Sequence, residues 1–116
     1  MAKVSGGCHC GAVRFEAEVD TSSGTECNCS YCTKSGNILA FTGADGFRQT
    51  AGADDLTDYR FNRQVIAHLF CKRCGISAFG RGKGPAGKEM AAINLRCVDD
   101  IDLKSVTRMP FNGAAL

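Results

Sequence analysis

Eight cysteines are the residues of this 116-residue chain best suited to chemistry, and seven of them fall into three short groups. The groups are a pair, a triplet and a second pair: Cys8 and Cys10; Cys27, Cys29 and Cys32; Cys71 and Cys74. A structural zinc site takes four protein ligands, whereas a catalytic zinc site takes three and leaves a position for water or substrate. The two pairs together therefore predict a closed zinc site, and the triplet predicts an open one.

The two pairs match the tetrahedral preference of zinc for four thiolates. Gly75 directly follows Cys74, and a glycine there suits the positive φ that a tight turn between two strands often requires. Because about 60 residues separate Cys10 from Cys71, a shared ion would tie the start of the chain to a later hairpin. We predict a structural zinc ion on Cys8, Cys10, Cys71 and Cys74, with an iron centre as the alternative.

The triplet predicts a second zinc ion with a free fourth position. A thiol that binds there would lose its proton to become a nucleophile, and a carbonyl oxygen would be polarised. Two alternatives stay open: a closed site completed by Cys97, His9 or His68, or a redox triplet without metal. His9 lies inside the first cysteine turn, so we expect it to point away from the ion. His68 alternates with apolar neighbours, which favours a half-buried structural residue.

Composition narrows the classes of function. The length of 116 residues predicts one domain, residues 1–116. The formal charge of +2 would fall to about −1 if seven thiolates held two divalent ions, and the basic residues are scattered, so a nucleic-acid partner is not indicated.

The sequence has no apolar run of the kind that indicates a signal peptide or a membrane span. We therefore expect a cytoplasmic location, where cysteines more often bind metal than form disulfides. Export would instead allow four disulfide bridges.

The periodicity predicts short strands. Residues 12–19 alternate, with Val13, Phe15, Ala17 and Val19 on one face and polar residues on the other. Further strands are expected over 37–41, 47–50, 57–61, 65–70, 76–79 and 91–97. The glycine-rich stretch 80–88 is expected to be a mobile loop, and the tail to be irregular apart from a helical turn near 99–103. The fold class is therefore all-β, mainly antiparallel, with little helix.

Four segments resemble the family of glutathione-dependent formaldehyde-activating enzymes and the related centromere protein V: GGCHCGAVRF (6–15), CNCSYC (27–32), FCKRCG (70–75) and AINLRC (92–97). The resemblance implies a β-tent fold with a structural zinc ion on the two cysteine pairs and a catalytic zinc ion on the triplet. The implied reaction joins the thiol of glutathione to formaldehyde as S-hydroxymethylglutathione, or splits that adduct, as a carbon–sulfur lyase.

Members of this family often carry arginines directly after the triplet, where this chain has Thr33 and Lys34. Lys34 keeps a positive charge that could bind a carboxylate of glutathione, although without the bidentate fork of arginine. The leading hypothesis is thus a zinc-dependent lyase that acts on a small thiol–aldehyde adduct. The alternative is a binding module in which both zinc ions are structural and a surface contacts protein or nucleic acid. Residues 60–63 (RFNR) are a faint signal for that alternative.

Overall fold

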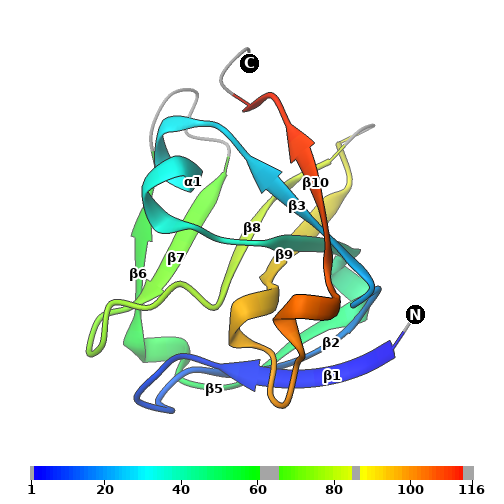
Figure 1. Ribbon diagram of the computed structural model, residues 1–116. Helices are drawn as coiled ribbons and strands as arrows, with labels where there is room; N and C mark the ends of the chain where they lie inside the picture. The colour runs from blue at the N-terminus through cyan, green and yellow to red at the C-terminus, as the bar shows by residue number, and fades with distance from the viewer. Residues whose placement is uncertain (1, 61–65, 85–86, 114–116) are drawn as a thin grey trace.

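The computed structural model describes residues 2–60, 66–84 and 87–113, and its strands form two sheets (Figure 1). The small sheet has the order β1-β2-β5, and the large sheet has the order β10-β3-β4-β9-β8-β7-β6. The strands of the small sheet are β1 Ala2–Gly7, β2 Arg14–Val19 and β5 Phe47–Ala51. Those of the large sheet are β3 Ser23–Cys27, β4 Leu39–Gly43, β6 Leu56–Tyr59, β7 Ala67–Cys71, β8 Phe79–Lys83, β9 Glu89–Asn94 and β10 Thr107–Phe111.

Neighbouring strands pair antiparallel, except that β10 runs parallel to β3. Within the described residues α1, Ser30–Ser35, is the one α-helix, and the other helical pieces are single 3₁₀ turns. The prediction of a mainly antiparallel β fold with little helix is confirmed. In the described part of the chain, no helix has the length and apolar character needed to cross a membrane.

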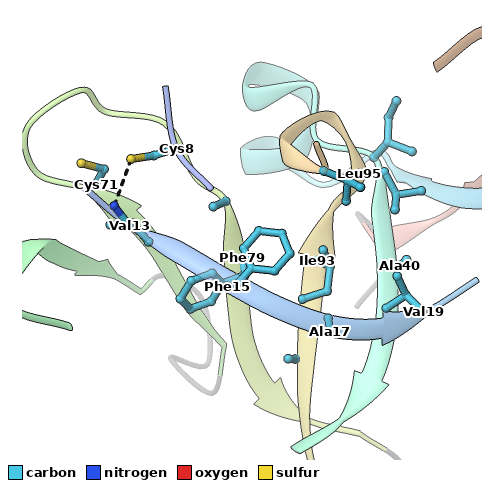
Figure 2. Close-up of a cluster of buried hydrophobic side chains, with 14 of the residues drawn as sticks. Cys8, Val13, Phe15, Ala17, Val19, Ala40, Cys71, Phe79, Ile93 and Leu95 are labelled. Atoms are coloured by element: carbon cyan, nitrogen blue, oxygen red, sulfur yellow. Dashed lines mark hydrogen bonds between the residues drawn. The ribbon is translucent and has the colours of Figure 1, made fainter. Parts of the chain in front are cut away.

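The alternating strand β2 places one face of the small sheet on the core. Its side chains at Phe15, Ala17 and Val19 are buried, and Glu18 between them is exposed. The ring of Phe15 lies between the sheets, with its centroid 6.2 Å from that of Phe47 and 6.0 Å from that of Phe79. Figure 2 shows Phe15 facing the large sheet at the centre of this cluster. The strand predicted over 12–19 therefore supplies a large part of the core.

The large sheet meets β2 with a row of buried side chains. Phe79, Ile93 and Ala40 are partners in register across β8, β9 and β4 (Figure 2). Fully burying a side chain such as Phe or Ile stabilises a fold by about 1.5–3 kcal/mol. The row therefore fixes how the central strands sit against the small sheet, and with them the segments that carry the cysteines.

The glycine-rich stretch is not a loop over residues 80–83. Gly80 and Gly82 belong to β8 and pair with Ala92 and Met90 of β9. A Cβ on Gly80 would lie only 3.1 Å from the carbonyl oxygen of Ala67. The small residue therefore allows β7 to approach, and pairing with strands distant in sequence outweighs the low strand propensity of glycine. Residues 85 and 86 of the stretch lie outside the described residues.

The chain after β9 also differs from the prediction. The strand expected over 91–97 ends at Asn94, whose side chain caps a 3₁₀ turn, Leu95–Cys97, by accepting a hydrogen bond from Arg96 N. The helical turn expected near 99–103 lies at Leu103–Ser105, and the tail that we expected to be irregular contains β10. Of the strand expected over 76–79, only Phe79 belongs to a strand.

The remaining expected strands are present with shifted ends. Residues 37–41, 47–50, 57–61 and 65–70 correspond to β4, β5, β6 and β7, with ends that move by at most two residues. Residues 61 and 65 lie outside the described part of the chain. The first strand, β1, was not predicted, because its sequence AKVSGG has neither strong strand propensity nor alternation.

We expect Phe15→Ala to destabilise the protein by about 3–5 kcal/mol, because it leaves a cavity at the point where both sheets meet. Denaturant unfolding followed by circular dichroism measures this loss. The control is Thr50→Ala on β5, where the side chain is exposed and the change should be within about 0.5 kcal/mol. A loss below about 1 kcal/mol for Phe15→Ala would show that the core does not depend on this ring.

Candidate metal centres

Two groups of cysteine sulfurs lie close together in the structure. Within each group all Sγ atoms are within 4.8 Å of one another. We call the four-sulfur group the first centre and the three-sulfur group the second centre: Cys8, Cys10, Cys71 and Cys74; Cys27, Cys29 and Cys32. These two groups are the same two sets of cysteines that the spacing in the sequence predicted. All eight cysteines are free thiols, so the disulfide alternative has no support in the structure.

The first centre has the dimensions of a tetrahedral site. The Sγ of Cys10 lies 3.6 Å from that of Cys8 and 3.7 Å from that of Cys71. Four thiolates at about 2.3 Å from one ion are separated by about 3.8 Å, which follows from tetrahedral geometry. The donor set and its spacing therefore fit a thiolate-binding metal ion.

Two tight turns hold these sulfurs. In the turn after β7, Gly75 N donates to Cys71 O at 2.8 Å, Cys71 N donates to Ile76 O at 3.0 Å, and Arg73 N donates to Cys71 Sγ at 3.4 Å. Gly75 has φ +82°, so the positive φ expected there is confirmed. In the turn between β1 and β2, Val13 N donates to Cys8 Sγ at 3.3 Å. Backbone N–H groups aimed at sulfur favour the thiolate form.

Without a cation, the sulfurs of the first centre have pKa values that are shifted in opposite directions. The backbone N–H of Cys10 lowers the pKa of Cys74 to about 6. For Cys10 itself, the N–H of Ala12 lowers the pKa, but desolvation and the neighbouring sulfurs outweigh it and raise the pKa to about 11. Thiolates this close repel one another, so they cannot all ionise together. A divalent cation among them removes that repulsion.

The second centre spans a strand end and a helix start. Cys27 is the last residue of β3, Cys29 is the N-cap of α1, and Cys32 is buried within α1. The three cysteines therefore do not lie on one loop: Cys29 Sγ accepts a hydrogen bond from Cys32 N at 3.4 Å, and the helix begins after Cys29. Gly36, with φ +72°, ends it. That glycine was the available sequence signal for the helix.

The pKa values within the triplet diverge. Burial acts to raise the pKa of Cys29, but the backbone N–H of Cys32 and the two neighbouring thiols lower it overall. Burial and the neighbouring sulfurs raise the pKa of Cys32. The opposite directions of these pKa shifts make Cys29 easier to ionise than Cys32, and a cation would favour the thiolate form of both. This donor set also fits a thiophilic metal ion, with three protein ligands.

Neither centre includes Cys97, His9 or His68. Cys97 lies in the turn after β9, where Asn94 Nδ2 is 3.6 Å from its sulfur, and burial raises its pKa to about 11. His9 is exposed in the first cysteine turn. His68 is half-buried, its ring centroid lies 4.3 Å from that of Tyr31, and burial lowers its pKa. These three residues therefore supply no fourth ligand that would close the second centre.

Other predicted residues lie near the second centre or away from it. Lys34 is exposed in the last turn of α1, two residues after Cys32. Of the basic stretch 60–63, only Arg60 is described, and it pairs with Asp58 at 2.9 Å.

Sequence reasoning missed Tyr31, although it stands between two ligands. Its ring also lies 6.0 Å from that of Tyr59, so an aromatic cluster joins α1 to β6 and β7.

The amino-acid sequence also matches a family model. The model describes the glutathione-dependent formaldehyde-activating enzymes, and the match covers residues 3–110. The chain belongs to this family. The matched range contains both centres and every strand from β2 to β9. The resemblance seen in the four sequence segments is thereby confirmed.

The chain is also similar to a crystal structure of a Rhodobacter sphaeroides protein. The two share 29% sequence identity with a TM-score of 0.79. The alignment covers 90% of this chain and 99% of that chain.

The two centres should respond differently to loss of one sulfur. A structural zinc ion contributes about 10–16 kcal/mol to the folding of small zinc peptides, and a whole domain is stable by only about 5–15 kcal/mol. We therefore expect Cys74→Ser, which opens the link between the first turn and β7, to leave the chain largely unfolded. Cys29→Ser should keep most of the fold.

Far-UV circular dichroism and thermal unfolding of the metal-loaded variants measure the difference. Equal losses of stability in the two variants would contradict the assignment of separate roles to the centres.

Proposed function

We propose that this protein is a zinc-dependent carbon–sulfur lyase that splits or forms the adduct of glutathione with a small aldehyde, such as S-hydroxymethylglutathione. The observation that carries the proposal is the second centre, which gathers three cysteine sulfurs and, among the described residues, no fourth cysteine or histidine. Membership of a family of glutathione-dependent formaldehyde-activating enzymes supports the choice of thiol and aldehyde.

In this proposal both centres hold zinc. Cys8, Cys10, Cys71 and Cys74 hold a structural ion, and Cys27, Cys29 and Cys32 hold a catalytic one. When bound with three protein ligands, zinc acidifies a thiol or polarises a carbonyl oxygen at its fourth position. The three thiolates of the chain lower the net charge there, which favours activation of a thiol over strong polarisation of a carbonyl.

The reaction is a balanced addition without redox change. In the synthetic direction the glutathione sulfur bonds to the aldehyde carbon, and the π electrons of the carbonyl move to its oxygen. The proton that leaves the thiol ends on that oxygen. In the reverse direction the carbon–sulfur bond breaks and the proton returns to sulfur. The chain therefore has to hold the two partners and pass one proton between them.

We assign Lys34 to substrate binding. Its ammonium group is exposed at the end of α1, on the same helix as Cys32. An anionic tripeptide whose thiol lies at the second centre can extend toward this end of the helix. A lysine offers a point charge to a carboxylate, and an exposed pair of this kind is worth about 0.2–1 kcal/mol.

Activity tests the proposal directly. The zinc-loaded protein should accelerate adduct formation from glutathione and formaldehyde, and cleavage of the adduct, above the uncatalysed rates. Nuclear magnetic resonance of the hydroxymethyl group follows both directions. Cys29→Ser should reduce the rate to the uncatalysed level.

The matched control is Cys97→Ser, which removes a cysteine sulfur outside both centres and should keep the rate. A wild-type rate equal to background, or full activity of Cys29→Ser, would overturn the proposal.

Lys34→Ala should raise KM for glutathione about 2- to 5-fold with little change in kcat, because a point charge that binds ground state and transition state equally affects KM. Lys34→Arg should restore KM. Lys104→Ala removes an exposed lysine from the distant turn Leu103–Ser105 and serves as the control. An unchanged KM in Lys34→Ala would remove this residue from the site.

A further inference from the structure

The end of the described chain contacts the second centre. β10 lies beside β3 (Figure 1), and Phe111 is the register partner of Cys27. Asn28, which stands between two cysteines of the centre, is bonded twice to this end of the chain. Its backbone N donates to Phe111 O at 3.1 Å, and its side-chain Nδ2 donates to Asn112 Oδ1 at 3.0 Å. The backbone that carries Cys27 and Cys29 is therefore held by residues more than 80 positions later.

Gly113 makes the closest approach. A Cβ on Gly113 would overlap the sulfur of Cys27 and would lie 3.4 Å from Cys29 Cβ. Gly113 is not one of the described glycines that have a positive φ. Its backbone is therefore open to alanine, and the reason for glycine here is the space beside the Cys27 sulfur.

We propose that residues 111–113 are a positioning segment of the second centre. The segment fixes the backbone of Cys27 and Cys29 through Asn28, and its glycine leaves room for the Cys27 sulfur to face the other two sulfurs. The inference deepens the proposed function and rests on the second centre being a metal site, but it concerns metal affinity and not turnover.

The physical argument is one of geometry. Metal ligands have to lie within about 0.2 Å of their required distance from the ion. A methyl group that overlaps the Cys27 sulfur forces that side chain to turn or the segment to move away. Either change takes one of three donors out of position. Loss of a group that orients a ligand typically weakens metal affinity about 10- to 100-fold.

The effect should be confined to one centre. The nearest atoms to a Cβ on Gly113 belong to Cys27, Cys29 and Phe111, and none belongs to the first centre. Within the segment, Phe111 ends the edge strand β10, Asn112 is exposed, and Gly113 has no side chain, so a change there removes no buried core side chain.

Zinc competition tests the proposal without any substrate. The zinc-loaded full chain is titrated with a chromophoric chelator, and the release step that Cys29→Ser abolishes is assigned to the second centre. For Gly113→Ala we expect that step to occur at about 10- to 100-fold weaker zinc affinity, with the step of the first centre unchanged. Asn112→Ala removes the acceptor for Asn28 without adding a methyl group and should weaken the same step by a smaller factor.

Thr107→Ala, at the exposed start of β10, is the control and should release both ions as the wild type does. Wild-type affinity at both centres in Gly113→Ala and Asn112→Ala would overturn the proposal. Equal weakening of both centres in either variant would also overturn it, because the segment would then support the whole fold. If the wild type lacks lyase activity but Gly113→Ala and Asn112→Ala weaken only the second-centre step, the proposed function fails and the positioning role stands.

Discussion

Repulsion between crowded thiolates is the constraint on which the rest of this structure depends. Four sulfurs of the first centre lie within 4.8 Å of one another, and they come from two turns 61 residues apart in the chain. In water such groups would separate or stay protonated, and only a cation makes their ionised form favourable. A metal ion at the first centre would therefore link the turn after β1 to the end of β7, and would give a 116-residue fold a tie that its modest core does not supply.

The second centre uses the same thiolate chemistry for a different purpose. Its three sulfurs come from six consecutive residues, so it ties together little of the fold. It is instead held from outside: α1 orients Cys29 and Cys32, and residues 111–113 contact Cys27 and Asn28. Because the fold supports this centre but does not depend on it, the centre can leave one ligand position open for substrate. That division between a tie and an open site is the physical basis of the function proposed above.

Local patterns predicted part of this molecule well. The spacing within each cysteine group and the alternation of β2 depend on neighbours in sequence, and ligand arithmetic then joins the two cysteine pairs, although 61 positions separate Cys10 from Cys71. The errors involve distant partners. Gly80 and Gly82 form a strand because β7 and β9 flank them, and β10 forms because β3 offers an edge. The role of Gly113 depends on a sulfur 86 positions earlier in the sequence, which no periodicity can indicate.

The most direct test of the account is metal content together with the sulfur coordination of each ion, measured on the intact protein by elemental analysis and X-ray absorption. The account predicts two zinc ions per chain with about 3.5 sulfurs per ion on average, as one four-sulfur site and one three-sulfur site with a light atom would give. That light atom should be displaced when glutathione is added. Four sulfurs around every ion, or one ion per chain, would contradict the account.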